Sequence, residues 1–423
     1  MFDMSLEELM NVKVTTSTKT SEKISQVPSS MTLFDKKRID RMGVKNVYDL
    51  LNFVPGFQVT RDVDIIAEPS IHTRGVTSLN GFRLNEVAWS RATIHNNYIP
   101  TSNVKKVEII RGSGSALYGS NAFLGVINII TDDKQNRLSI ETGSFNREYL
   151  SFNYYKPFTL ETSASISLDY NKDKGEDYAI NGKDPIEHLT LSTKFLHDKT
   201  SHNLNYTHEE INDFIHFNSS ANNTNWSESS TFKAMLNHGI KVSDKININT
   251  MFSYSQYNLD TIGLFKEATT LDTHDMFIGQ YIKSTSYDAD INMEYKMDEN
   301  HHLISGVVFR REGVNYQGAN TNFLSPDGSH IAPKESFYLG DILKFEDIGQ
   351  LDNQEKFINV SSFYTQYKGT INEKLTTFLG VHYDKYSLGG NSVNPRASLI
   401  YSVSNDTTLK LLYATAFRAP TNK

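Results

Sequence analysis

The stretch that decides the fold is VKKVEIIRGSGSALYGSNAFLGVINIIT, residues Val104–Thr131, in which two apolar runs flank a glycine-rich segment. The pattern predicts a strand over Val104–Ile110, a second strand over Val126–Ile130 and no helix between them. Glycine permits positive φ and close approach of another backbone, so this segment can turn tightly against a neighbouring surface. The glycines in question are Gly112, Gly114 and Gly119.

The same glycines do not make a phosphate-binding loop. Gly112 and Gly114 match the opening of a dinucleotide-binding fingerprint, but the third glycine falls at Gly119. A β run follows, rather than a helix whose N-terminus would hold a pyrophosphate. Nucleotide binding is therefore not expected, and an ordinary turn of a small globular domain stays open at this point.

The composition favours a chain rich in strands. The 423 residues leave room for two or more domains, yet only 38% are hydrophobic, 11% are aromatic and the mean hydropathy is −0.45. No run of about 18 apolar residues occurs, so a transmembrane helix is not expected, whereas a membrane barrel gives only a weak hydropathy signal. The lack of cysteine excludes disulfides and thiolate metal sites. The net charge of −7 argues against nucleic acid as a partner.

The beginning of the chain predicts an extended tether. Residues Asn11–Lys23, NVKVTTSTKTSEK, are polar, rich in threonine and prone to form strands. Such a segment can pair with an exposed sheet edge of a partner, because β-addition uses backbone hydrogen bonds and tolerates many side chains. A disordered tail is the alternative.

A small α/β region follows. The pattern predicts a strand near Ser30–Phe34, a helix near Lys36–Met42 and a second helix near Asn46–Phe53. Ile71–Val76 is predicted to form another short strand, and Asn80–Gly81 is a turn signal.

After Thr131 the hydrophobic period becomes two and stays there. We expect about 13 strands of roughly 9 to 13 residues, the length that crosses a bilayer at a tilt, whereas strands of soluble sandwiches are usually shorter. The alternating runs lie near 138–142, 150–154, 166–170, 188–196, 202–209, 231–241, 245–256, 285–297, 301–311, 357–369, 374–386, 395–403 and 407–416.

The connections between these runs alternate in length. Short polar turns occupy 156–161, 197–201, 242–244, 298–300, 369–373 and 404–406, and the expected long loops are 172–187, 211–230, 257–284 and 312–356. Tight turns at one end and extended loops at the other are typical of an outer-membrane barrel. Tyrosine and phenylalanine gather at strand ends, as an interfacial girdle requires.

Together these motifs resemble the family of TonB-dependent outer-membrane receptors. The resemblance rests on VPGFQV (Val54–Val59), TRGV (Thr73–Val76), VEIIRGSGSALYGSNAFLGVINIIT (Val107–Thr131) and FRAPT (Phe417–Thr421). It implies a mainly β fold: a tether over 1–24, a small α/β plug over 25–134, and an antiparallel transmembrane β-barrel over 135–423. It also implies a location in the outer membrane of a Gram-negative bacterium, contact with its lipid, and a monomer.

The resemblance implies a receptor and transporter for a scarce metal chelate. A ferric siderophore is the first expectation, and haem or cobalamin is the alternative within the family. A passive porin-like barrel is the alternative from another class. It has no need of about 130 residues of α/β structure before the first barrel strand, nor of a strand-pairing tether.

The resemblance also assigns roles to residues near the N-terminus. The stretch VKVTTS resembles the family's TonB box, which pairs with TonB, itself energised by an inner-membrane complex. The box-like residues are Val12, Lys13, Val14, Thr15 and Thr16.

Two arginines match the plug motif of the family. Arg74 and Arg111 are expected to pair with barrel glutamates, since a guanidinium facing a polar lumen needs a carboxylate. Solvated surface arginines are the alternative. The other residues of the plug motif are Gly75, Gly112, Tyr118 and Gly119.

Three features depart from the family pattern. A strand usually found between Val76 and Asn80–Gly81 is missing, which predicts an uncovered edge in the plug sheet. No export signal precedes the box-like residues. Only about 13 strands are present where about 22 are expected, so we interpret the chain as a C-terminally truncated piece, because barrels cannot leave edges in lipid.

The candidate ligand residues lie in RATIHNNY, residues 91–98, which occupies the position of the plug apex. Arg91 suits an anionic siderophore, His95 could bind haem iron or hydrogen-bond a siderophore, and Tyr98 offers a stacking surface. No resident cofactor is expected. Calcium in the acidic loop 172–187 is a weaker alternative, because the spacing is not that of an EF-hand and lysines offset the charge. No catalytic constellation is evident, so the chain is not expected to be an enzyme.

Overall fold

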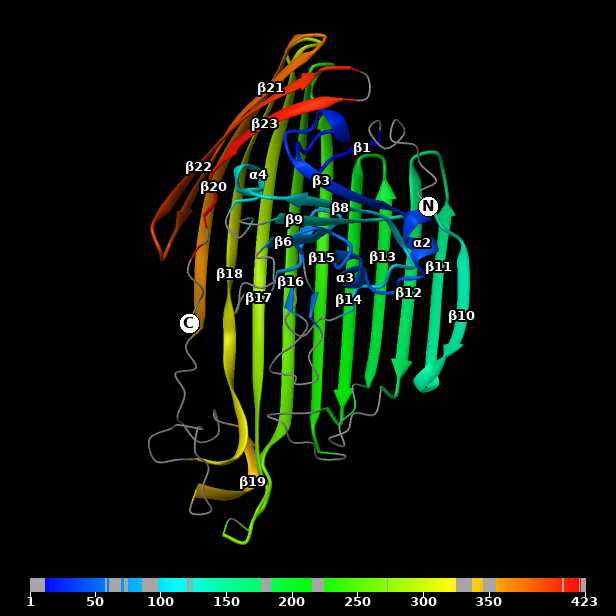
Figure 1. The fold of residues 1–423 in the computed structure, drawn as a ribbon, viewed down its shortest axis with the longest axis vertical. Coiled ribbons are helices and arrows are strands. Elements are labelled where there is room, and N and C mark those ends of the chain that lie inside the picture. Colours follow the sequence, from blue (N-terminus) through cyan, green and yellow to red (C-terminus); the bar gives the residue numbers. More distant parts are fainter. Residues whose placement is uncertain are drawn as a thin grey trace.

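The computed structural model describes residues 12–57, 59–60, 70–71, 75–85, 98–119, 122, 125–175, 183, 185–214, 224–271, 273–324, 337–344, 355–404, 407–417 and 419. A large antiparallel sheet, the wall, curves around a small N-terminal domain, the plug (Figure 1). The helices of the described part are all too short or too polar to cross a membrane.

The plug is built on a five-stranded sheet with the order β3-β8-β9-β6-β7. Its strands are β3 Ser30–Asp35, β6 Gly75–Leu79, β7 Phe82–Arg83, β8 Val104–Arg111 and β9 Gly125–Thr131. Two-stranded pairs β1 Lys13–Val14 with β2 Glu22–Lys23, and β4 Val59–Thr60 with β5 Ser70–Ile71, accompany it, and a 3-10 turn, η1, covers Ile24–Gln26.

Two helices, α2 Lys36–Met42 and α3 Val47–Leu51, contribute buried side chains to the main plug core together with β8 and β9. The Asp35 carboxylate accepts a hydrogen bond from the Arg38 amide at the start of α2, and Gly43 ends this helix in the left-handed conformation. The predicted strand and both predicted helices of this region are therefore present.

The glycine-rich segment holds one helical turn, α4 Ser115–Tyr118, where no helix was expected. The amides of Leu117 and Tyr118 both donate to the Gly114 carbonyl at 3.1 Å. A helix of four residues is too short to show the hydrophobic period of a helix, so this turn could not be predicted from the sequence. Gly114 is required by close approach, because a Cβ there would lie 2.4 Å from Cγ2 of Val126.

The edge of the plug sheet is covered, contrary to the expectation. β6 begins at Gly75, later than predicted, and runs parallel to β9 with Gly75 opposite Gly125. After the Asn80–Gly81 turn, β7 pairs with β6 through Ser78 opposite Arg83. A two-residue edge strand limits further pairing.

Within the described ranges the wall contains 14 strands, of which 13 follow one another in chain order and β19 pairs only with β18. This confirms the predicted strand count. The strands are β10 Arg137–Gly143, β11 Arg147–Pro157, β12 Thr162–Asp173, β13 Ile186–His197, β14 Thr200–Asn212, β15 Trp226–Lys241, β16 Ile246–Lys266, β17 Met276–Lys296, β18 His301–Phe323, β19 Tyr338–Lys344, β20 Lys356–Asn372, β21 Leu375–Tyr386, β22 Asn391–Ser402 and β23 Thr408–Ala414. A 3-10 turn, η3 Ser144–Asn146, joins β10 to β11.

Several strands are longer than predicted, so the predicted loops 211–230, 257–284 and 312–356 are partly wrong. β16 has 21 residues, which at about 3.3 Å per residue span roughly 70 Å, more than twice a hydrocarbon core of about 30 Å. Hairpins therefore extend beyond the bilayer, and β19 lies at the end remote from the plug (Figure 1). The connections 144–146 and 387–390 are short, so loop length does not alternate at every turn.

The two faces of the wall differ in polarity along each strand. On β22 the side chains of Val393 and Leu399 are exposed on the outer face, whereas Asn394, Arg396 and Ser398 are buried on the face toward the plug. An apolar outer face and a polar lumen are what a lipid-embedded barrel requires.

Candidate functional site

The N-terminal segment, residues 12–29, is packed into the structure rather than extended. Val14 and Thr16 are 0% and 1% exposed, and Ser17 is also buried. Val14 pairs with Glu22 across β1 and β2 and packs in a small apolar cluster with Val27. The box-like residues therefore lie inside the molecule in this conformation, and their role as a TonB box stays a prediction.

Glu108 on β8 binds the backbone of this segment. Its Oε2 accepts hydrogen bonds from the amides of Thr15 and Thr16, both at 2.9 Å, and from Oγ1 of Thr16 at 2.5 Å. Its Oε1 faces Nζ of Lys106 at 2.5 Å. Burial alone would raise the pKa of Glu108, but the bonds from Lys106, Thr16 and Thr15 lower it below the ordinary value.

The plug motif also contacts the segment. The Tyr118 hydroxyl donates to the Thr16 carbonyl at 2.8 Å, and Nδ2 of Asn128 donates to Oγ1 of Thr16 at 3.1 Å. Burial raises the pKa of Tyr118, so its hydroxyl keeps its proton at neutral pH. Tyr118 and Thr16, both predicted as site residues, are thus brought together.

Charged wall residues bind the same segment from the other side. Nζ of Lys19 forms an ion pair with Asp290 of β17 at 2.8 Å and donates a hydrogen bond to the Tyr364 hydroxyl of β20 at 2.7 Å. Both carboxylate oxygens of Glu22 accept from Nζ of Lys368 at 2.8 Å. Burial lowers the pKa of Lys19, but Asp290 and Tyr364 outweigh it and raise the pKa.

Two further wall cations bind carbonyl groups of the segment. Arg396 of β22 donates to the Ser17 carbonyl at 3.2 Å and to the Pro28 carbonyl. Lys410 of β23 donates to the Ile24 and Val27 carbonyls at 3.0 and 2.9 Å. Because these groups are occupied, pairing with a partner strand first requires the segment to leave its site.

The glycine-rich segment of the plug motif contacts β21 at Gly119. Gly119 has a φ of +68°, and a Cβ there would lie 3.0 Å from Nε2 of His382 and 3.2 Å from Oδ1 of Asp384. Nε2 of His382 lies 2.9 Å from Asp384, which also accepts from the Ser362 hydroxyl at 2.5 Å. Glycine is needed here for its conformation and for the closeness of the wall.

Of the two predicted arginine pairs, that of Arg111 is not found among the described residues, and that of Arg74 stays a prediction. Nε of Arg111 is buried without a hydrogen-bond partner, and no ion pair joins Arg111 to a glutamate within the described ranges. Arg74 lies outside the described residues, as do Arg91 and His95.

Arg83 on β7, which the sequence did not single out, does approach a charged group of the wall. Arg310 of β18 bonds Asp288 and lies 3.6 Å from Glu312. Burial and the neighbouring Arg310 lower the pKa of Arg83, while Glu312 and Asp288 raise it. Arg83 therefore lies within electrostatic range of these charged wall residues, and its Nε and Nη1 are buried without a hydrogen-bond partner.

Tyr98 is buried at the junction of plug and wall, not displayed at an apex. It is 5% exposed, and its ring centroid lies 4.7 Å from that of His188 on β13. Its hydroxyl is buried without a hydrogen-bond partner, and burial raises its pKa. In this conformation no face of the ring is free to stack on a ligand.

A cavity of about 1020 Å³ lies between the plug and the wall strands from β13 to β21. Lys19 and Arg83 line it from the plug side, and Asp288, Asp290 and Asn292 line it from β17. The N-terminal segment therefore forms part of the boundary of this cavity.

The acidic loop shows no calcium geometry in its described part. Glu187 pairs with Lys172 at 2.5 Å and accepts from the Tyr170 hydroxyl at 2.9 Å, so its oxygens are occupied. Residues 176–182 and 184 lie outside the description. Across the described ranges no three histidine or acidic side chains gather closely enough to hold a metal ion.

Of the residues that bind the segment, Glu108, Lys368, Arg396 and Lys410 were not predicted. Of these four residues, only Glu108 could have been recognised from the sequence, because it is a carboxylate inside the otherwise apolar run Val107–Ile110. A charge at such a position needs a buried partner. The wall cations look like any other lumen-facing polar residue of a barrel strand.

Family models place the chain among known proteins. The TonB-dependent receptor plug domain matches residues 23–126, and the TonB-dependent receptor-like β-barrel matches residues 112–423. The chain belongs to the family of TonB-dependent receptors, whose barrels lie in the outer membrane and which are transporters and receptors rather than enzymes. Membership favours the receptor over the porin-like alternative.

Individual relatives differ in what they bind. The vitamin B12 transporter BtuB of Vibrio vulnificus (strain CMCP6) is 24% identical over 310 residues, which are 68% of this chain and 50% of that protein. The chain thus spans about half the length of this curated relative. The siderophore receptor PiuA of Acinetobacter baumannii superposes with a TM-score of 0.72 at 14% identity, covering 97% of this chain and 68% of that one. The ferric-catecholate import receptor Fiu of E. coli K12 gives 0.66 at 16%, covering 95% and 71%.

Proposed function

We propose that the chain is part of an energy-dependent importer of a metal chelate, with a ferric siderophore as the first ligand class. The observation that carries the proposal is the N-terminal segment, whose strand-forming residues are held against Glu108 and Tyr118 by replaceable polar bonds. Such a segment can be withdrawn and paired with a partner strand, and TonB is the partner that the family supplies.

The choice of ligand rests on the chemistry of the predicted apex. Arg91 gives a planar guanidinium suited to carboxylate or catecholate oxygens, whereas His95 would favour haem through its imidazole. The structural neighbours PiuA and Fiu are named as siderophore and ferric-catecholate receptors, and BtuB is named as a vitamin B12 transporter. Cobalamin is therefore the second candidate.

Ligand binding by the full-length receptor tests the ligand class. Ferric catecholate and ferric carboxylate siderophores, haem and cyanocobalamin would be titrated against the purified protein while intrinsic fluorescence is followed. We expect Arg91→Ala to weaken binding of the siderophore by about 10-fold or more, the effect of one charged hydrogen bond. The matched control is Arg41→Ala, an exposed arginine on α2, which should leave binding unchanged.

Two results would redirect the proposal. Tight binding of cyanocobalamin with none of the siderophores would make the chain part of a cobalamin receptor. Haem binding that falls on His95→Ala would support the haem alternative, and haem binding untouched by that substitution would remove its only support in the sequence.

A further inference from the structure

Lys233 on β15 is a buried lysine without a carboxylate partner. Its side chain faces the plug, 6% of the residue is exposed, and its Nζ lies 5.4 Å from the ring centroid of Phe82 on β7. No hydrogen bond or ion pair of Lys233 occurs within the described part of the chain. An ammonium group removed from water without a partner is costly, so an unpaired one calls for a compensating group.

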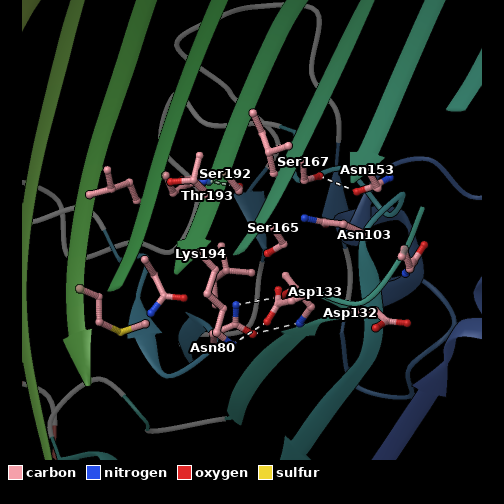
Figure 2. A pocket seen from close by; sticks show the side chains of 18 of the residues that line it. Asn80, Asn103, Asp132, Asp133, Asn153, Ser165, Ser167, Ser192, Thr193 and Lys194 are labelled. Carbon is pink, nitrogen blue, oxygen red and sulfur yellow. Dashed lines mark hydrogen bonds and ion pairs between the residues drawn. The ribbon is translucent and has the colours of Figure 1, made fainter. Parts of the chain in front are cut away.

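Lys233 lines a small cavity of about 60 Å³ between the plug and β11–β15. Figure 2 shows this cavity, to which the plug contributes Asn80 and Asn103. Both polar and apolar side chains of the wall line it: Asn153, Ser165, Ser167, Ser192, Thr193 and Asn205 are polar, and Ile166, Leu204 and Met235 are apolar.

Some polar groups around the cavity have a hydrogen-bond or ion-pair partner, and others have none among the described residues. Asp133 and Lys194 point toward each other and pair at 2.6 Å (Figure 2), and Nδ2 of Asn80 donates to Oγ1 of Thr131 at 2.8 Å. By contrast, Lys233 has no hydrogen-bond or ion-pair partner among the described residues. Gln135 also lines the cavity, and its Nε2 is buried without a hydrogen-bond partner.

We propose that this cavity binds a small monovalent inorganic anion of chloride size, with Lys233 as its donor. A volume of 60 Å³ exceeds the roughly 10 to 15 Å³ that one water needs, so a halide fits together with water, whereas a metal chelate does not. Asp133 is neutralised by its pair with Lys194, whereas Asp132 also lines the cavity and opposes any anion, a divalent one such as hydrogen phosphate most strongly.

The anion would join the plug to the wall. The cavity is bounded by the end of β9 and by β13–β15, so an ion in it contacts both domains. Since the docked plug builds the site, the anion stabilises docking by ligand linkage. This site is separate from the transported ligand and from the N-terminal segment, so its test does not depend on the proposed transport function.

Crystals of the full-length receptor, grown without chloride and in the presence of bromide, test the site directly. We expect an anomalous bromide peak in contact with Nζ of Lys233, and no peak in Lys233→Met crystals. Ordered water at this position without an anomalous peak in the wild type would overturn the proposal.

Thermal unfolding provides a second readout. At constant ionic strength, replacing gluconate with chloride is expected to raise the Tm of the full-length receptor. Lys233→Met should lose this response and be no less stable than wild type in gluconate, since it removes a buried unpaired charge. The control Lys199→Met changes an exposed lysine that lines the larger cavity and should keep the chloride response. An equal chloride response in Lys233→Met and wild type would refute the assignment.

Discussion

The N-terminal segment and the body of the plug are fastened to different parts of the wall. The segment meets β17, β20, β22 and β23 through charged bonds to Asp290, Lys368, Arg396 and Lys410. The plug body meets β10 and β13 elsewhere, where Lys45 pairs with Glu141 at 2.5 Å and Asp133 pairs with Lys194 at 2.6 Å.

The contacts just named for the segment and those named for the plug body share no residues. We expect a pull on the segment to break the segment's own bonds to the wall before the ion pairs of the plug body, because the segment carries the load first.

The largest expected effect comes from breaking the pairing function of the segment. Val14→Pro should abolish uptake while leaving ligand binding intact, because proline has no amide to donate to a partner strand. Uptake of radiolabelled ligand by whole cells and binding to outer membranes are the measurements. Ser21→Pro lies in an exposed position outside the box-like residues and should retain uptake. Normal uptake by Val14→Pro would eliminate the assignment of the tether.

Removing the carboxylate that holds the segment should release it without undocking the plug. Glu108→Gln loses a charged acceptor of the Thr15 and Thr16 amides, each bond to a charged group contributing about 1.5 to 3 kcal/mol. Hydrogen exchange at these two amides should accelerate by roughly 10- to 100-fold. Glu141→Gln, which breaks an ion pair of the plug body, should leave this exchange unchanged. Equal protection in Glu108→Gln and wild type would show that Glu108 does not hold the segment.

Acid should release the segment through the same carboxylate. The bonds from Lys106, Thr16 and Thr15 lower the pKa of Glu108 in the folded state, so its contribution is complete above the ordinary glutamate pKa of 4.5. That contribution is lost as the pH falls below 4.5 and through the lower folded value. Hydrogen exchange measured down this pH range should show the loss in wild type and not in Glu108→Gln. A loss of equal size in both proteins would assign the acid response to another group.

The wall strands could be predicted from the sequence, but the residues at which they end could not. Alternation such as Val393, Asn394 and Leu399 is imposed locally, since lipid lies on one face and the lumen on the other. Beyond the bilayer both faces meet water, so β16 and β18 continue past the point at which the apolar signal stops.

Site contacts were harder to predict because they join distant parts of the chain. Thr16 and Glu108 are 92 residues apart, and Ser17 and Arg396 are 379 apart. Neither spacing carries a periodic signal. The motif residues Tyr118 and Gly119 were found by resemblance, while their partners Thr16 and His382 became evident only from the packing.

The smallest effect is expected from a single wall contact, because the segment has several. Lys19→Met removes the pair with Asp290, and both side chains keep some solvent exposure, so screening reduces the contribution to about 1 kcal/mol. Exchange of the Thr15 and Thr16 amides should then rise only several-fold. Combining Lys19→Met with Lys368→Met, which removes the pair with Glu22, should approach the effect of Glu108→Gln. If the double variant behaves like the wild type, the Lys19 and Lys368 pairs do not hold the segment, and its wall contacts that matter are reduced to those of Arg396 and Lys410.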